Sequence, residues 1–304
     1  MSRPAPKNLE ASIHQRLLNQ ARESGRPFNE LLQYFAIERF LYRLSQSPHQ
    51  EKFVLKGALM FAVWQAPPAR PTMDIDLLGR MENQVETIVS IVRDVCRQKV
   101  EPDGLNFDPD SVDGNRIAEA AEYQGVRVSF RGSLGNAKIF MQLDVGFGDV
   151  IFPRATSVKY PTLLDLSGPR LRGYTRESLI GEKFQAMVRL GSLNSRMKDF
   201  FDIWFLSRHF DFDAPRLSTA ISKTFERRKT EVPSNLNDLF EPLMRDPVKV
   251  TQWRTFAQRN RLQAAPEKLG DVLSLIGEFL DPVVQSFKEG IQFEATWQAP
   301  GPWM

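Results

Sequence analysis

Residues 53–79 read FVLKGALMFAVWQAPPARPTMDIDLLG, and the rest of the chain is interpreted around them. Near the end of this stretch, Asp74 and Asp76 stand two residues apart in a short apolar run. In an extended strand, side chains two residues apart share one face. We therefore expect both carboxylates on one face of a strand, with Ile75 and Leu77 on the face that is buried.

The closeness of the two carboxylates predicts a bound cation. Like charges repel, which raises the proton affinity of both groups, whereas Mg²⁺ prefers oxygen ligands and usually binds one or two carboxylates together with substrate phosphates. Upstream, Lys56 and Gly57 provide a positive charge and a backbone that can approach a phosphate closely. The combination favours a site for a nucleotide triphosphate over the simpler interpretation, in which the aspartates are the polar face of an edge strand.

The composition is that of an ordinary globular protein. The chain has 304 residues, 42% of them hydrophobic and 25% charged, which suffices for one large or two smaller domains. A single cysteine, Cys96, excludes an internal disulfide, fits a reducing compartment and is expected to be a buried structural thiol. No secretory signal or membrane span is recognisable, so we expect a cytoplasmic protein. The net charge of +3 is a weak indication of an anionic partner.

The hydrophobic pattern predicts mixed secondary structure before residue 150. Helices are expected over residues 1–50 and 82–96, a loop over 101–115, and strands over 123–130 and 138–145. On the helix before residue 50, the basic residues are expected to form a solvated face, with an RNA contact as the minor alternative; these are Arg39 and Arg43. In the last strand, the alternation of side chains places Asp144 on the face opposite the apolar row.

The segment 174–191 reads YTRESLIGEKFQAMVRLG and predicts a helix with an N-cap at Thr175 and an end at Gly191. Lys183 lies inside the apolar stripe of this helix. A lysine in such a position usually extends its charged end to the edge of the core. The alternative is that its ammonium enters a cleft and holds nucleotide phosphates, where it would stabilise a transition state.

A second charged helix follows, because residues 194–203 read NSRMKDFFDI. Asp199 and Asp202 lie three residues apart, on one face of the expected helix. Ordinary intrahelical ion pairs are one interpretation, with Arg196 contacting Asp199 and Lys198 contacting Asp202. From residue 213 onward the pattern is helical and rich in basic residues, which could bind an RNA backbone or form a solvated surface.

These blocks together resemble a known family. A glycine turn, a spacer and Asp-x-Asp are similar to the first motif of polymerase-β-type nucleotidyltransferases. Residues 17–209 more closely resemble the AbiEii-type nucleotidyltransferase toxins of abortive-infection toxin–antitoxin systems. One departure is Ala58, which follows Gly57 where many relatives have glycine or serine. The resemblance implies an α+β fold, in which a nucleotidyltransferase-like mixed sheet flanked by helices (residues 1–170) precedes a helical domain (171–296). The two prolines and the glycine of residues 297–304 predict a flexible tail.

The resemblance also implies an active site. Mg²⁺ would be bound by three carboxylates, those of Asp74, Asp76 and Asp144. Lys183 would steady the phosphates, and Asp199, or as second choice Asp202, would act near the attacking hydroxyl. The residues expected to contact substrate are Lys56, Gly57, Arg70, Thr72, Lys183 and Arg196.

The implied reaction transfers a nucleoside monophosphate from an NTP to an RNA acceptor, with the tRNA 3′ end as the leading candidate. A cognate antitoxin protein would counter the toxin, and no membrane would be involved. Two alternatives remain open. One is nucleotidylation of a protein or small molecule, and the other is an inactive nucleotidyltransferase fold that binds a partner. Walker-type NTPases and Ser or Cys hydrolases are disfavoured, because their motifs are absent from the sequence.

Overall fold

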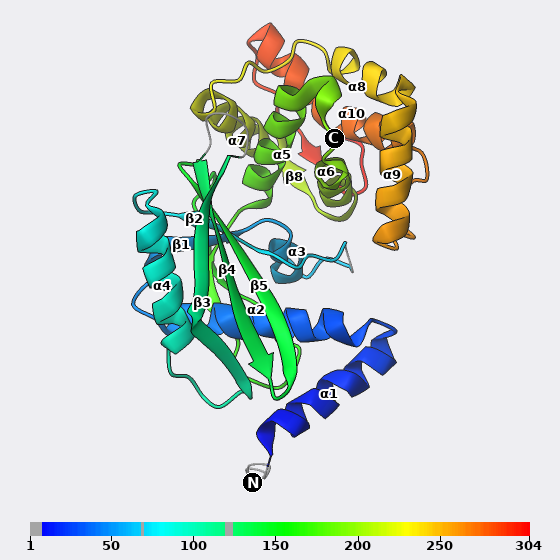
Figure 1. The fold of residues 1–304 in the computed structure, drawn as a ribbon. Helices are drawn as coiled ribbons and strands as arrows, with labels where there is room; N and C mark the ends of the chain where they lie inside the picture. Colours follow the sequence, from blue (N-terminus) through cyan, green and yellow to red (C-terminus); the bar gives the residue numbers. More distant parts are fainter. Residues whose placement is uncertain (1–7, 68–69, 119–123) are drawn as a thin grey trace. The chain divides into compact units, whose positions relative to one another are not determined.

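The computed structural model describes residues 8–67, 70–118 and 124–304. These form two compact units (Figure 1). The first contains the described residues within 1–65, 72–148 and 156–173; the second contains those within 66–71, 149–155 and 174–304. Two short segments that are flanked in the sequence by parts of the first unit therefore belong to the second unit.

The first unit is built on a mixed sheet. Within the described residues, seven strands pair in the order β3-β4-β5-β2-β1-β7-β6. The pairs β1–β7 and β2–β5 are parallel and the others are antiparallel. The strands are β1 (Phe53–Lys56), β2 (Ile75–Gly79), β3 (Leu105–Ala118), β4 (Gln124–Leu134), β5 (Ala137–Phe147), β6 (Thr156–Lys159) and β7 (Arg170–Gly173).

Strand β3 corrects the sequence analysis, which expected a loop over residues 101–115. Its pairing with β4 shifts register between Asp108 and Asp113, so the strand contains a bulge. The bulge accommodates Pro109, and β3 is an edge strand, where a missing backbone donor is tolerated. The strand expected over 123–130 is β4, although Tyr123 lies outside the described residues.

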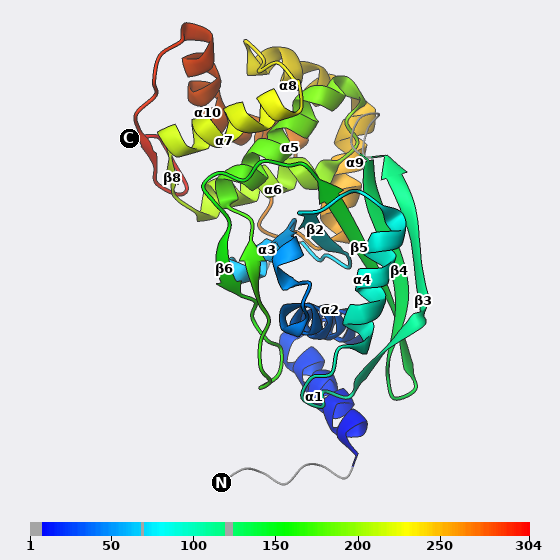
Figure 2. The same ribbon diagram turned by 90° about the vertical axis from the view of Figure 1, so that its left-hand side faces the viewer.

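Helices α2 and α4 cover the same face of this sheet (Figure 2). The ring of Phe40 on α2 lies 4.8 Å from that of Phe130 on β4. Helix α4 packs on β3 and contains Cys96, which is buried as expected; burial raises the pKa of its thiol to about 12. The helices of this unit are α1 (Leu9–Ser24), α2 (Phe28–Gln46), α3 (Leu59–Val63) and α4 (Val85–Arg97), with a short 3-10 helix η1 (Gln50–Lys52).

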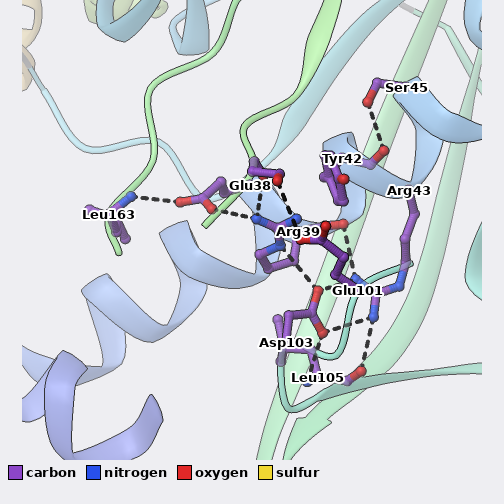
Figure 3. Close-up of polar contacts among 10 residues, drawn as sticks. Glu38, Arg39, Tyr42, Arg43, Ser45, Glu101, Asp103, Leu105 and Leu163 are labelled. Carbon is purple, nitrogen blue, oxygen red and sulfur yellow. Dashed lines mark hydrogen bonds and ion pairs between the residues drawn. The ribbon is translucent and has the colours of Figure 1, made fainter. Parts of the chain in front are cut away.

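A buried ion network fixes α2 to two loops (Figure 3). Arg43 donates from Nη1 and Nη2 to the two carboxylate oxygens of Asp103, at 2.6 and 3.0 Å, and Arg39 Nε donates to Asp103 at 3.1 Å. Arg39 Nη1 also donates to Glu38 Oε1 at 3.1 Å, while Glu38 Oε2 accepts from the backbone N–H of Leu163 at 2.7 Å. All four charged side chains are buried, so the expected solvated face at Arg39 and Arg43 is wrong.

The second unit is helical. It contains α5 (Arg176–Leu190), η2 (Gly191–Leu193), α6 (Met197–His209), α7 (Ala214–Arg227), α8 (Leu236–Arg245), α9 (Pro247–Arg259), α10 (Leu269–Glu289) and a small sheet of β8 (Phe212–Asp213) and β9 (Thr296–Trp297). Helix α5 has the predicted ends: Thr175 Oγ1 accepts from the backbone of Ser178 at 3.2 Å, and Gly191 follows the last turn with φ +50°. In the part of the chain that is described, no helix is both long and apolar enough to cross a membrane.

Segment 149–155 is attached to the second unit by specific contacts. Asp149 accepts from Arg228 Nη2 on the turn after α7 at 2.8 Å. The carbonyl of Phe152 accepts from the hydroxyls of Thr175 and Ser178 at 2.8 and 2.9 Å. The start of α5 therefore holds this segment.

The C-terminal tail also differs from expectation. Its prolines and glycine predict flexibility, yet Trp297 is 1% exposed and lies in β9, which pairs with β8. Its indole Nε1 donates to the carbonyl of Ser207 at 2.6 Å, and Trp303 Nε1 donates to the carbonyl of Phe279 at 2.9 Å. The burial of the Trp297 ring and the hydrogen bonds of both indole N–H groups outweigh the local composition.

Candidate active site

Two of the predicted carboxylates stand side by side on neighbouring strands. Asp76 on β2 and Asp144 on β5 are Cα partners in a parallel pair. Ile75 and Leu143 are buried at 0% and 1% exposure, whereas Asp76 and Asp144 are partly exposed. The predicted alternation therefore holds, and both aspartates lie on the face of the sheet opposite the one that α2 and α4 cover.

Asp74 stands directly before β2, and Thr72 helps to fix the chain there. The backbone N–H of Thr72 donates to the hydroxyl of Tyr34 on α2 at 3.0 Å. The Thr72 hydroxyl lies 3.5 Å from the carbonyl of Asp74, at the limit of a hydrogen bond. Thr72 thus positions the entry to β2.

Gly57 lies against the carboxylate of Asp76. It follows β1 with φ +69°, and its neighbour Lys56 is the register partner of Asp76. A Cβ atom at Gly57 would stand 2.2 Å from Oδ2 of Asp76, closer than any side chain can approach. The backbone conformation and the carboxylate therefore both require glycine at this position.

Arg127 is a site residue that the sequence analysis missed. From β4 it donates through Nε and Nη2 to both oxygens of Asp144, at 2.8 and 2.7 Å. Its side chain remains 43% exposed. The alternation of β4, where Val126 and Val128 are buried, places Arg127 on the polar face, but only the strand register shows that it faces Asp144.

The carboxylate oxygens on this face of the sheet are the type of ligand that a hard divalent cation binds. Across the described residues, no three His, Cys, Asp or Glu side chains converge closely enough to hold a metal ion. Asp76 and Asp144 nevertheless offer carboxylate oxygens from adjacent positions, and Gly57 keeps the space beside Asp76 free of any side chain. The Arg127 guanidinium already donates to both oxygens of Asp144, so a cation bound by Asp144 would have to displace or share that contact.

The other charged candidates meet in the second unit. Lys183 on α5 lies between two aspartates of α6: its Nζ is 2.6 Å from Oδ1 of Asp199 and 3.1 Å from Oδ2 of Asp202. Both aspartates are 0% exposed, and the Lys183 side chain is 9% exposed. The lysine therefore does not extend to solvent, as it would in the simple structural interpretation.

Two arginines complete this cluster. Arg70 donates through Nε and Nη2 to both oxygens of Asp202, each at 2.8 Å, and Arg196 Nε lies 2.7 Å from Oδ2 of Asp199. The expected pair of Lys198 with Asp202 is wrong, because Asp202 faces α5 and the segment holding Arg70, whereas Lys198 is exposed. The expected pair of Arg196 with Asp199 is present.

With both groups of residues located, the chain can be compared with known proteins. The family model described as nucleotidyl transferase AbiEii toxin, type IV TA system, matches residues 39–275, well over half of the chain. The chain belongs to the AbiEii nucleotidyltransferase toxin family. It is therefore a nucleotidyltransferase of a family found in type IV toxin–antitoxin systems, and all eleven candidate site residues lie inside the matched range.

Two solved structures from Helicobacter pylori are similar in outline to this AbiEii chain. JHP933 shares 15% sequence identity at a TM-score of 0.47, with 86% of this chain and 97% of that chain covered. A second protein, proposed to be a nucleotidyltransferase, shares 17% at a TM-score of 0.44, with 83% and 96% covered. No curated protein sequence matches the chain. The family assignment rests on the family model.

Neighbouring charges keep the side chains of Lys183 and Asp202 ionised. Burial disfavours the ammonium of Lys183, but Asp199 and Asp202 outweigh this and raise its pKa above the ordinary value. Burial likewise favours the protonated form of Asp202, but Arg70 and Lys183 outweigh it and lower the pKa of that carboxyl. Lys183 is thus a fixed positive charge at neutral pH and is not available to accept a proton.

Asp199 and Asp202 differ in the number of hydrogen bonds that their carboxylate oxygens accept. Asp202 accepts two hydrogen bonds from Arg70 and also contacts Lys183. Oδ2 of Asp199 is close to Arg196 but not in line with its N–H, and among the described residues it accepts no hydrogen bond. A buried carboxylate oxygen without a hydrogen bond is costly unless another donor reaches it. This difference favours Asp199 as the residue that meets a substrate hydroxyl.

The structure thus gathers the predicted residues into two groups. Lys56, Gly57, Thr72, Asp74, Asp76 and Asp144 belong to the first unit, with Arg127 added. Arg70, Lys183, Arg196, Asp199 and Asp202 belong to the second. Arg70, which is expected to contact substrate, donates through its guanidinium to Asp202 in this structure.

Proposed function

We propose that this AbiEii nucleotidyltransferase moves a nucleoside monophosphate from an NTP to the 3′ end of an RNA, with tRNA the first candidate. The reaction depends on Mg²⁺ and takes place in the cytoplasm. It arrests growth during abortive infection, and a cognate antitoxin protein opposes it. The observation that carries the proposal is the contact of Lys183 with Asp199, which pairs a permanent cation with a carboxylate whose Oδ2 is ion-paired with Arg196 but accepts no hydrogen bond among the described residues.

The strand carboxylates have the first role. Asp76 and Asp144, with Asp74 drawn in from the entry to β2, would hold the metal, which when bound would shield the triphosphate charge and lower the pKa of the acceptor hydroxyl. Arg127, which donates to both oxygens of Asp144, would have to release at least one of them for the metal. Gly57 has no side chain and so allows the backbone to lie close to the Asp76 carboxylate. Lys56, the register partner of Asp76, adds a positive charge. These residues bind the donor nucleotide.

The helical cluster has the second role. Lys183 stabilises negative charge that develops on the phosphates. Oδ2 of Asp199 accepts the proton of the attacking hydroxyl. The acceptor oxygen forms a bond to the α-phosphorus, the bond from that phosphorus to the bridging oxygen breaks, and pyrophosphate carries away the electron pair. Asp202 holds Lys183 and Arg70 in place.

The test uses two labels on the same nucleotide. Purified protein is incubated with total tRNA, Mg²⁺ and each NTP in turn, labelled at either the α- or the γ-phosphate. The proposal predicts that α-label enters RNA with one preferred NTP, that γ-label never does, and that Asp76→Asn abolishes the transfer. Label found instead on protein or on a small molecule would reject the RNA acceptor and support the alternative target.

A further inference from the structure

A groove of about 790 Å³ lies between the start of α6 and the side of α9, within the second unit. This volume falls in the range of ordinary ligand sites, roughly 300–1,000 Å³. The groove is lined by Ser195, Arg196, Met197, Lys198, Pro247, Val248, Thr251, Gln252, Thr255, Phe256 and Arg259. Neither the strand carboxylates nor Lys183 are among these residues.

The lining carries positive charge around an apolar floor. Arg196, Lys198 and Arg259 are its charged members, and none of the residues lining it in the described chain is acidic. Phe256 lines the groove and packs against Trp253, with ring centroids 5.7 Å apart. An aromatic ring beside cations is the arrangement that binds unpaired nucleotides, because bases stack on the ring and phosphates pair with the cations.

Gln252 supplies an independent sign of a missing ligand. Its Oε1 atom is buried and, within the described part of the chain, has no hydrogen-bond partner. Buried polar atoms are normally satisfied, and Gln252 lines the groove, so a rotation of its amide toward the groove would give this acceptor a donor on a bound ligand. The exocyclic amino group of a nucleobase is such a donor.

Arg196 connects the groove to Asp199, the proposed general base. Arg196 lines the groove, and the same side chain places its Nε 2.7 Å from Oδ2 of Asp199. A nucleotide bound in the groove would therefore lie next to the carboxylate that is proposed to receive the proton of the acceptor hydroxyl. Because Arg196 is ion-paired with Asp199, Lys198 and Arg259 are the lining cations that would pair with a ligand's phosphates. A protein segment would match them only if it were strongly acidic.

We propose that this groove binds an unpaired nucleotide close to the 3′ end of the RNA acceptor. The base packs on Phe256 and donates to Gln252, and the phosphodiester pairs with Lys198 and Arg259. This inference rests on the proposed function, because it names the subsite that presents the acceptor to Asp199.

The first test compares two charge reversals on one helix. Arg259→Glu alters the groove, whereas Arg254→Glu makes the same change at another exposed position of α9 that does not line it. The readout is binding of a fluorescein-labelled single-stranded oligoribonucleotide to the full chain. We expect Arg259→Glu to weaken binding about tenfold and to reduce its salt dependence, with Arg254→Glu within about twofold of wild type. Equal effects of both would overturn the proposal.

A second variant separates binding from folding. Gln252→Met removes the unsatisfied oxygen, so thermal stability should be unchanged or higher, while affinity for the oligoribonucleotide falls several-fold. A purely structural glutamine would give the opposite result, with a lower melting temperature and unchanged affinity. That outcome would also overturn the proposal.

Steady-state kinetics distinguish this inference from the function on which it rests. In Arg259→Glu, KM for RNA should rise about tenfold while KM for the NTP stays unchanged. A rise in the NTP value alone would assign the groove to the donor nucleotide and contradict the proposal. If the wild-type chain binds the oligoribonucleotide in an Arg259-dependent way but transfers nothing to RNA, the groove is supported and the proposed function fails.

Discussion

The ammonium nitrogen of Lys183 lies 2.6 Å from Oδ1 of Asp199, and neither side chain is more than 9% exposed. Each charge is therefore accommodated in the interior by the other. Removing one partner of a buried pair leaves an uncompensated charge, which is strongly destabilising. Loss of activity in variants of this cluster has to be read together with stability.

Lys183→Met should be destabilising, because both aspartates lose a buried cationic partner. Without the ammonium, Asp199 keeps only Arg196 and Asp202 keeps only Arg70 among the partners described above. Since each carboxylate still has one arginine, we expect the free energy of unfolding to fall by about 1–3 kcal/mol, measured by urea denaturation. Lys183→Arg keeps the charge and should recover most of this loss while leaving transfer activity low. Unchanged stability of Lys183→Met would contradict the geometry.

Asp199→Asn and Asp202→Asn should separate catalysis from structure. Asp202 makes more charged contacts, so its amide variant should lose more stability. Asp199→Asn should lose less stability but reduce kcat by about 10²–10⁴-fold, the usual contribution of a positioned general base. Denaturation and single-turnover rates on both variants give the comparison. A larger rate loss in the Asp202 variant, at equal stability, would transfer the catalytic role to it.

Arg127→Ala should lower the Mg²⁺ concentration needed for half-maximal activity. The guanidinium occupies both oxygens of Asp144, so it competes with a metal for that ligand. Arg131→Ala, four residues along the same strand, is the matched control and should leave the requirement unchanged. The measurement is a Mg²⁺ titration of transfer rates. A higher requirement in Arg127→Ala would mean that the arginine assists the site instead of competing.

Gly57→Ala should impair both folding and activity. The new methyl group would meet Oδ2 of Asp76 at 2.2 Å, in a backbone with φ +69°. Gly25→Ala is the control, because Gly25 has φ +66° but no heavy atom within 4 Å of its Cβ position. The control should lose about 1 kcal/mol of stability from backbone strain alone. Gly57→Ala should lose more and lose transfer activity; equal losses and full activity would contradict the close approach.

The Glu38 network makes stability fall as pH rises. Burial raises the pKa of Glu38 from 4.5 to about 7, against the opposing effects of the Leu163 hydrogen bond and Arg39. Between these values the folded state binds a proton that the unfolded state has lost, so its contribution is complete below pH 4.5 and is lost as pH rises through 7. The change is on the order of 3 kcal/mol.

Glu38→Gln isolates this effect, because glutamine mimics the protonated carboxyl and can still accept from Leu163. Urea denaturation at pH 5 and pH 8 should show a large stability difference in wild type and a smaller one in the variant. Parallel pH profiles would show that Glu38 is not the responsible group.

Local pattern was enough to predict several elements. Side chains alternate along β2 and β5, so Ile75 and Leu143 identified the buried face and placed Asp76 and Asp144 on the other. Thr175 and Gly191 marked the ends of α5 because capping depends on neighbouring residues only. The predicted family and the α+β fold are confirmed by the family match and by the mixed sheet with its flanking helices.

Long-range pairing could not be predicted in this way. The contact of Arg70 with Asp202 joins residues 132 positions apart, and that of Arg127 with Asp144 depends on strand register. The register shift in β3 interrupts the alternation of side chains by which a strand is recognised. The indole N–H of Trp297 donates to a carbonyl 90 residues earlier in the chain. In each case the decisive partner is distant in sequence, so no local pattern reports it.

The most direct test of the central claim is the mass of the RNA product. Total tRNA is treated with protein, Mg²⁺ and the preferred NTP, and its 3′-terminal fragments are weighed by mass spectrometry, with Asp76→Asn in parallel. The account predicts that each modified fragment gains the mass of one or more nucleoside monophosphates at its 3′ end, and that the variant adds none. Unchanged RNA in a preparation that binds the NTP, or an equal gain with Asp76→Asn, would contradict it.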